Sequence, residues 1–311
     1  MKNTSKLYYP YIESLRSILP IVDELIIAMG DHDADDLTEK AVLALQSPKI
    51  KIIKTVWDIE KYPHGTEYAH QTELAKQHCT GDWLFYLQSD EVIHEKYLDK
   101  ILQACKLYLN EEKVEGFLFN YIHFWGDYKH YIQNHAWYSH EIRIIRNKPE
   151  IHSWGDAQSF KYIRNFDGRS FRQKQFTRRL HVIKLEAYIY HYGWVRPPSL
   201  MQQKTKQMDS HYHEAKEVSR RHDFRSEHFD YGNLSNCNIF NDSHPAVMED
   251  FINQFNWSAE LHYDLNYIPQ RLALKHEKLK YVFLSWLENN LLGGQKIFGY
   301  QNWKLVRSYK S

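Results

Sequence analysis

The stretch that most constrains what this chain can fold into is residues 80–95, which read TGDWLFYLQSDEVIHE. Its apolar and aromatic run, residues 83–87, is unbroken rather than alternating, which is typical of a buried strand in a parallel sheet. The run ends abruptly in polar residues, among them Asp90 and Glu91. In open α/β sheets ligands bind beyond the carboxyl ends of the strands, so we expect the chemistry of this protein at that edge.

Two roles are open for Asp90 and Glu91. A magnesium-like ion is often held by one or two carboxylates together with substrate phosphates. Acidic residues are also common at the start of a helix, where they cap its free N–H groups. From the spacing alone, the capping role is the more common of the two.

Strands and helices alternate through the first half of the chain. Strand patterns at residues 23–29 and Ile50–Lys54 precede a helical pattern at about residues 66–77, which leads into the strand at residues 83–87. This alternation predicts a mostly parallel central sheet flanked by helices, in an α/β fold.

Carboxylates follow several of these strands. Asp31 and Asp33 come after the first strand pattern, Asp58 after the second and Asp90 after the third. Because the carboxyl ends of parallel strands meet at one edge, we expect these side chains to form a nucleotide site. The alternative for each of them is a solvated loop acid.

Composition excludes several classes of protein. Forty basic against thirty-nine acidic residues leave a net charge near zero, which does not indicate a nucleic-acid partner. The three cysteines are far apart and lack metal-ligand spacing, so we expect free thiols in a reducing compartment.

Residues 201–225 are rich in lysine and arginine, which predicts a solvated helix or, as a second reading, a peripheral contact with an anionic membrane. We therefore expect a cytoplasmic protein, with the inner face of the membrane as the alternative place.

Two segments resemble family-2 glycosyltransferases of the GT-A fold. GDWLFYLQSDEVIHE is similar to the strand and metal-binding corner of that family, where an Asp-x-Asp follows the corresponding strand. Here Gln88 stands in place of the first Asp, and Asp90 is the second. HYGWVRPP, residues 191–198, resembles a recurring segment of a bacterial and archaeal subgroup, and the resemblance spans nearly the whole chain.

This resemblance implies a GT-A domain over residues 1–200 and a helical C-terminal extension over residues 201–311. It implies an enzyme that moves a sugar from a nucleotide-diphosphate sugar to an acceptor hydroxyl of a glycan or a lipid-linked glycan, with inversion at the anomeric carbon. It also implies Mn²⁺ or Mg²⁺ as the cofactor.

Site residues are expected on the same grounds. Asp156 matches the acceptor-side acid that accepts the hydroxyl proton, and His191 matches a histidine that completes the metal site with Asp90. The donor-binding residues are expected to be Asp31, Asp33, Asp58, Gln88, Asp90 and Glu91. Flat aromatic rings suit a sugar, so Trp125, Trp154 and Trp194 are expected at the acceptor, with core packing as the alternative.

Two other classes of function stay open. A carbohydrate- or nucleotide-binding protein that keeps the fold without turnover is favoured by Gln88 and by the short N-terminus. A metal-dependent hydrolase is the second, although the chain has no HExxH motif.

The start of the chain differs from the family that it resembles. Family-2 enzymes open with a strand that contacts the nucleotide, whereas this chain reaches its first helical pattern after about ten residues, too few for a strand and its turn. We therefore expect the first strand to be missing and the start to have been assigned too late.

Overall fold

The computed structural model describes the whole chain except residues 214–216, 219–221, 223–225, 293–295, 298–300 and 307–311. Within that part the α-helices are α1 (Tyr11–Ile18), α2 (Thr38–Leu43), α3 (Thr66–Lys76), α4 (Leu98–Leu107), α5 (Pro198–Tyr212), α7 (Glu249–Asn253) and α8 (Leu279–Leu291). The strands are β1 (Leu25–Met29), β2 (Ile50–Lys54), β3 (Trp83–Phe85), β4 (Glu91–Ile93), β5 (Gly116–Trp125), β6 (His130–Ile132), β7 (His140–Arg146), β8 (Ile151–Trp154), β9 (Ser159–Ile163), β10 (Thr177–Trp194), β11 (Asn238–Ile239) and β12 (Trp303–Leu305).

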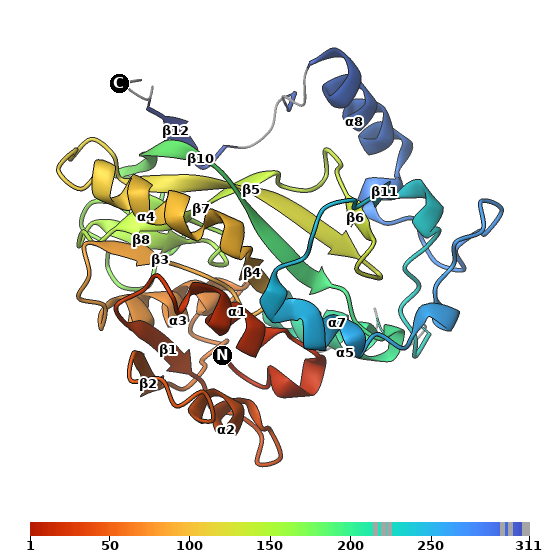
Figure 1. The fold of residues 1–311 in the computed structure, drawn as a ribbon, viewed down its shortest axis with the longest axis horizontal. Helices are drawn as coiled ribbons and strands as arrows, with labels where there is room; N and C mark the ends of the chain where they lie inside the picture. The colour runs from red at the N-terminus through yellow and green to blue at the C-terminus, as the bar shows by residue number, and fades with distance from the viewer. Residues whose placement is uncertain (214–216, 219–221, 223–225, 293–295, 298–300, 307–311) are drawn as a thin grey trace.

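The described strands form two sheets (Figure 1). β1 and β2 make a small parallel sheet, and the remaining strands make a large one. In the described part of the large sheet, only the pairings of β10 with β5 and with β12 are parallel. The sheet as a whole is mostly antiparallel and strongly curled into a half-barrel. The prediction of a GT-A fold with a mostly parallel central sheet is therefore wrong.

The sheet was predicted to be parallel because the apolar run at residues 83–87 indicated a buried strand. An unbroken apolar run indicates a strand covered on both faces, but it does not give the direction of the neighbouring strands. In β3, Phe85 packs into one apolar cluster and its neighbour Tyr86 packs against another, while the strand itself runs antiparallel to β7. The strands from β5 to β10 follow one another without an α-helix between them. Parallel neighbours need a long crossover connection, so such a series pairs mainly antiparallel.

The longest strand, β10, brings the two halves of the chain together. It spans 18 residues, runs parallel to β5 and pairs near its end with β4, where His191 lies opposite Glu91. Register shifts interrupt its pairing with β5 between Lys184 and Tyr188 and between His191 and Trp194, and such irregularities bend a strand. The end of β10 therefore lies beside the residues that follow β3.

The last third of the chain packs around the same sheet. α5 follows β10 directly, β11 pairs with β6, and β12 pairs with β10. A domain boundary at residue 200 stays a prediction. Among the described helices, none combines the length and the apolar character that a bilayer crossing requires.

Candidate functional site

A cavity of about 1070 Å³ lies between β1 and β3 and reaches under α5. Its polar part, which we call the polar pocket, lies where β3 ends. The polar pocket is lined by Gln88, Ser89, Asp90, Asp156, Gln158, His191, Lys204 and Tyr212. Its apolar part, which we call the slot, is lined on its two sides by residues 25–28 and residues 83–87.

Asp90 is the central charge of the polar pocket. It lies in the turn between β3 and β4, is buried, and accepts a hydrogen bond from Lys204 Nζ at 3.3 Å. Lys204 Nζ also donates to the carbonyl oxygen of Gly193 at 2.6 Å. Burial opposes ionisation of Asp90, but the charges of Lys204 and Arg196 outweigh it and hold the pKa of the carboxyl at about 2. Burial lowers the pKa of Lys204 to about 7, with Arg196 acting in the same direction and Asp90 against it.

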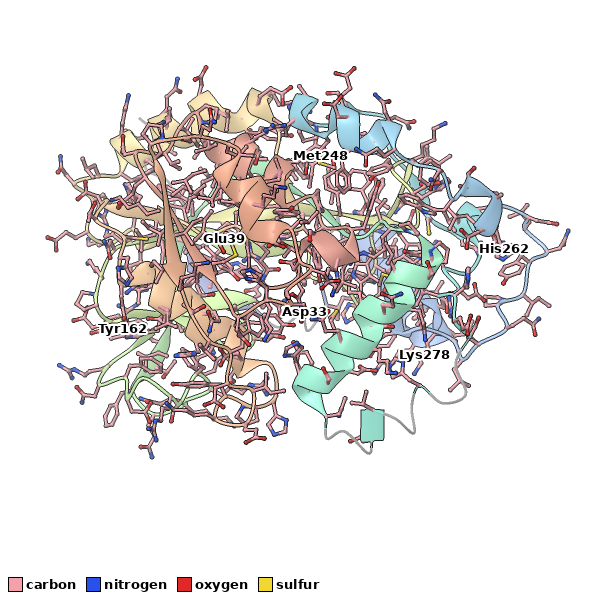
Figure 2. All side chains as sticks on the ribbon, turned by 90° about the horizontal axis from the view of Figure 1, so that it is seen from below. Asp33, Glu39, Tyr162, Met248, His262 and Lys278 are labelled. Atoms are coloured by element: carbon pink, nitrogen blue, oxygen red, sulfur yellow. The ribbon has the colours of Figure 1, made fainter. Side chains whose placement is uncertain are left out.

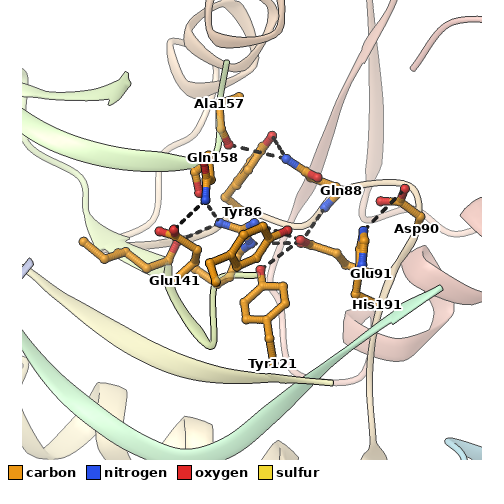
Figure 3. Close-up of polar contacts among 12 residues, drawn as sticks. Tyr86, Gln88, Asp90, Glu91, Tyr121, Glu141, Ala157, Gln158 and His191 are labelled. Carbon is orange, nitrogen blue, oxygen red and sulfur yellow. Dashed lines mark hydrogen bonds and ion pairs between the residues drawn. The ribbon is translucent and has the colours of Figure 1, made fainter. Parts of the chain in front are cut away.

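A chain of hydrogen bonds orients His191 toward Asp90. The carbonyl oxygen of Tyr138 can only accept, so His123 Nε2, at 2.7 Å from it, carries the proton. Burial lowers the pKa of both histidines. In neutral His123 the other nitrogen, Nδ1, therefore accepts from His191 Nδ1 at 3.0 Å. This network assigns a lone pair to His191 Nε2, which lies 3.8 Å from Asp90 Oδ2 (Figure 3).

Gly193 keeps the space between these two groups open. A Cβ atom at this position would lie 2.5 Å from His191 Nε2 and 2.6 Å from Asp90 Oδ2. Any other residue would therefore have to displace His191 or Asp90. The glycine of the HYGW sequence thus has a steric role at the site.

Asp90 and His191 fit a divalent ion as a partial ligand set. A carboxylate oxygen and an imidazole lone pair that face each other both favour a cation between them. No group of three or more such ligands occurs among the described residues. An ion here would therefore take its other ligands from water or from substrate phosphates, as magnesium commonly does.

Glu91 lies next to the polar pocket but is not one of its lining residues. Its carboxylate is fully buried and accepts hydrogen bonds from Arg143 Nε at 2.9 Å, Arg143 Nη2 at 2.8 Å and the Tyr121 hydroxyl at 2.8 Å (Figure 3). Gln88 does line the pocket, and its amide nitrogen lies 3.2 Å from the Tyr86 hydroxyl and 3.4 Å from the Ala157 carbonyl oxygen. Glu91 therefore anchors β4 to β7, while Gln88 is available to a ligand.

Asp156 also lines the polar pocket. It occupies the turn between β8 and β9, where Gly155 has a φ of 68° and Ala157 a φ of 61°. The Tyr212 hydroxyl, at the end of α5, donates to Asp156 Oδ2 at 2.8 Å. A smaller hollow of about 310 Å³ adjoins Asp156 and is lined in part by Trp154 and Arg172.

The acids that follow β1 and β2 do not line the cavity. Asp31 pairs with Lys2 at 2.8 Å and accepts from the Trp57 backbone N–H at 2.8 Å, so it positions two residues that do line the cavity. Asp33 lies on the surface and pairs with Lys6 at 2.7 Å (Figure 2). Asp58 Oδ1 accepts from the Lys61 backbone N–H at 2.9 Å, within a turn.

The tryptophans expected at the acceptor occupy three different environments. Trp194 lines the main cavity and Trp154 lines the smaller hollow. Trp125 is buried in an apolar cluster, where its ring nitrogen donates to the carbonyl oxygen of Tyr231 at 2.9 Å. The structure thus brings Gln88, Asp90, Asp156, His191 and Trp194 to one cavity, and it places Trp125 in the core.

Sequence reasoning missed the two side chains that α5 contributes. Lys204 was expected on a solvated helix but is buried against Asp90, and Tyr212 carried no expectation. The spacing of these residues, about two helical turns, places both on one face of α5. That shared face is the signal that could have identified them. Lys216, Arg220, Arg221 and Arg225 lie outside the described residues.

The comparisons with known proteins give a weak structural similarity. No protein-family model and no curated protein matches this sequence. Among solved structures, the chain is similar to the crystal structure of S. aureus TarS, a glycosyltransferase, with a TM-score of 0.38 and 14% identity. The match covers 71% of this chain and 40% of that chain, so the present chain spans well under half of the TarS structure.

Proposed function

We propose that this protein is a glycosyltransferase that moves a sugar from a nucleotide-diphosphate sugar to an acceptor hydroxyl. The observation that carries the proposal is the polar pocket, which is lined both by Asp90 with its partner Lys204 and by Asp156 with its partner Tyr212. A cation suits a leaving diphosphate, and a second carboxylate in the same pocket suits an attacking hydroxyl.

On the donor side, the charge that develops on the diphosphate needs a positive partner. The Lys204 ammonium lies in the pocket wall beside Asp90 and would supply part of that charge. Asp90 and His191 would hold Mn²⁺ or Mg²⁺, which supplies Lewis-acid stabilisation of a leaving group when bound. Gln88 lines the same pocket, and since its amide N–H groups donate to Tyr86 and Ala157, it would accept a hydrogen bond from a donor hydroxyl at its amide oxygen.

On the acceptor side, Asp156 would accept the proton of the attacking hydroxyl. The Tyr212 hydroxyl binds Asp156 Oδ2, which leaves Oδ1 for the acceptor. With Asp156 as the base we expect direct displacement by the acceptor hydroxyl, with inversion at the anomeric carbon and no covalent intermediate. Trp194 offers a ring on which a sugar of a glycan or lipid-linked acceptor would pack.

Further along the cavity, Trp57, Tyr68 and His211 form an aromatic group that suits a nucleobase or a sugar ring. The Trp57 ring lies 5.2 Å from Tyr68 and 5.5 Å from His211, measured between ring centroids. Trp57 Nε1 and His211 Nδ1 are buried and have no hydrogen-bond partner among the residues that the structure describes. A buried polar atom without a partner is costly, so a ligand that reaches either atom would gain that hydrogen bond.

The test is a panel of nucleotide sugars followed by transfer assays. A donor at about a hundred times its Kd stabilises the fold by about 2.7 kcal/mol, which is a rise of several degrees in Tm. The donor that raises Tm should then be consumed faster when a glycan acceptor is present. A complete panel of nucleoside-diphosphate sugars without any rise in Tm would contradict the proposal.

The second candidate is a nucleotide- or carbohydrate-binding protein without turnover. Lys204 favours it, because an ammonium beside Asp90 already neutralises the carboxylate that a metal would need. Hydrolysis of the donor in the absence of acceptor separates the two candidates. A transferase should hydrolyse the donor slowly, whereas a binding protein should bind it and leave it intact.

A further inference from the structure

Helix α8 turns polar side chains inward and apolar side chains outward. Ser285 and Glu288 are buried, with exposed fractions of 8% and 3%, whereas Phe283 and Trp286 are 60% and 53% exposed. A surface helix usually has the reverse arrangement, with its apolar stripe against the core. The outward side of α8 is therefore an unusually apolar part of the protein surface.

Specific hydrogen bonds hold α8 in this orientation. The Ser285 hydroxyl accepts from the backbone N–H of His135 at 2.8 Å, and Glu288 Oε1 lies 2.6 Å from His135 Nδ1. The same Glu288 oxygen accepts from the backbone N–H of Ile297 at 2.8 Å. Turning the helix to bury its apolar side would break all three contacts, so the apolar side stays outward.

The outward side forms one continuous stripe, which we call the α8 face. It consists of Leu279, Val282, Phe283 and Trp286, all of them exposed. The spacing i, i+3, i+4 and i+7 places these side chains together on one side of the helix. α8 lies at the periphery of the molecule (Figure 1). Large apolar side chains that gather on a surface in this way mark a site of interaction.

The exposed charges beside the α8 face are positive. Three exposed lysines lie at or just before the start of the helix, Lys275, Lys278 and Lys280. Residues 271–292 contain two acids, and both are bound within the protein. Glu277 accepts from Arg271 at 2.7 Å, and Glu288 is buried against His135. A partner of the α8 face therefore meets apolar side chains together with positive charge.

An anionic lipid surface matches both features. A helix at a membrane surface buries its apolar stripe among headgroups and acyl chains, tryptophan favours this boundary, and lysines reach anionic phosphates. A second copy of the chain matches only the first feature. Packing α8 on α8 would bring the lysines of two copies together, with no exposed acid in residues 271–292 of either copy to meet them.

We propose that α8 docks this protein on an anionic membrane surface, with the α8 face among the headgroups and Lys278 and Lys280 beside lipid phosphates. α8 has 13 residues, whereas a helix that spans a bilayer needs about 20, so α8 lies in the plane of the surface. The proposal does not depend on the function proposed for the polar pocket.

Flotation with lipid vesicles tests the apolar part of this contact. The unmodified chain should bind vesicles of phosphatidylcholine with about 30% phosphatidylglycerol, and bind pure phosphatidylcholine about tenfold more weakly or less. Phe283→Gln with Trp286→Gln should weaken binding to the anionic vesicles by about tenfold or more, because apolar area is lost from the contact. Leu43→Gln with Leu107→Gln, at similarly exposed positions on α2 and α4, is the matched control and should bind like the unmodified chain.

A second variant tests the charges. Lys278→Gln with Lys280→Gln should weaken binding to the anionic vesicles by about tenfold or more and leave binding to pure phosphatidylcholine unchanged. Lys106→Gln with Lys113→Gln, also at exposed positions, should bind like the unmodified chain. All four variants change exposed side chains, so their Tm should stay at that of the unmodified chain.

Three outcomes would overturn the proposal. The first is an unmodified chain that binds vesicles of neither composition. The second is a variant of the α8 face or of its two lysines that binds the anionic vesicles as tightly as the unmodified chain. The third is a dimer in sedimentation velocity that Phe283→Gln with Trp286→Gln converts to a monomer while vesicles bind neither chain, which would assign the α8 face to a second copy.

Discussion

At the scale of single residues, the polar pocket contains a buried carboxylate that stays ionised only because positively charged side chains lie beside it. Asp90 stays ionised because the charges of Lys204 and Arg196 lie beside it, although burial by itself favours the neutral acid. His191 turns a lone pair to the same carboxylate because His123 holds its other nitrogen. These contacts define what a substitution at each position should do.

Asp90→Asn should remove the metal-dependent part of nucleotide binding. An amide is a weaker ligand for a hard cation than a carboxylate, so added Mn²⁺ should no longer improve the Kd of a nucleoside diphosphate. In the unmodified chain, and in the Asp167→Asn control at an exposed position that does not line the cavity, calorimetry should give about tenfold tighter binding with Mn²⁺. Equal affinity with and without Mn²⁺ in the unmodified chain would contradict the metal role.

Asp156→Asn should separate transfer from donor binding. The substitution keeps the shape of the side chain and its contact with Tyr212 but removes the basic oxygen. Sugar transfer should fall by about a hundredfold or more, as is usual for loss of a general base, while the Kd for the donor stays unchanged. Normal transfer by this variant would show that another group accepts the proton.

Glu141→Gln should change how stability depends on pH. Glu141 is buried, Gln158 donates to its Oε1 at 2.9 Å, and burial raises its pKa from 4.5 to about 8. The folded state therefore binds more protons than the unfolded state between these pH values, and this carboxyl lowers the free energy of unfolding as the pH rises.

Urea unfolding at pH 5 and at pH 8 measures this effect. The loss of stability between the two pH values should be smaller in Glu141→Gln than in the unmodified chain. The exposed Glu112 provides the matched control, and Glu112→Gln should keep the full loss. The same pH dependence in all three chains would rule out a raised pKa for Glu141.

At the scale of elements, α5 covers the cavity and is held there at two points. Lys204 reaches Asp90 from the middle of the helix, and Tyr212 reaches Asp156 at its end. At the same end of the helix, the backbone N–H of Gly65 donates to the carbonyl oxygen of His211 at 2.9 Å. A Cβ atom at position 65 would lie 2.7 Å from the Tyr212 ring, so glycine permits this close contact.

Lys204→Met should therefore loosen α5 as well as alter the site. It leaves the Asp90 carboxylate without its hydrogen-bonded cation, and breaking a buried pair in this way costs about 3 kcal/mol. Urea unfolding should show that loss in Lys204→Met and little change in Lys206→Met, at an exposed position on the same helix. Adding Asp90→Asn to Lys204→Met should restore part of the stability; further loss in the double variant would contradict the pairing.

At the scale of the whole molecule, the slot separates β1 and β2 from the curled sheet. The Met1 amine is buried beside this gap. Burial lowers its pKa to about 6 in the folded chain, below the ordinary value of 8.0 that it has in the unfolded chain. Between these pH values the unfolded state binds more protons, so the amine makes the folded chain less stable at pH 6 than at pH 8.

Nα-acetylation of Met1 should remove this dependence. The gain in Tm on acetylation should be larger at pH 6 than at pH 8, as differential scanning calorimetry can measure. An equal gain at both pH values would indicate that the amine is solvated and that Met1 does not enter the slot.

The sequence by itself determined the local elements of the first half of the chain. The strand predicted at Ile50–Lys54 is β2, the helix predicted at residues 66–77 is α3, and the segment that precedes Pro20 is the helix α1. These elements follow from periodicity and from proline, which act over a few residues. Chemistry was also expected where the apolar run at residues 83–87 ends, and the polar pocket lies there.

Only the tertiary structure decided which strands pair and which side chains meet. The strands from β5 to β10 pair mainly antiparallel because short connections return each strand beside the last. A buried apolar run in the sequence does not indicate the direction of the neighbouring strands. Asp90 and Lys204 are 114 residues apart in the chain, and Glu91 and Arg143 are 52 apart. Contacts at such separations depend on how β10 and α5 pack, which no local pattern of residues specifies.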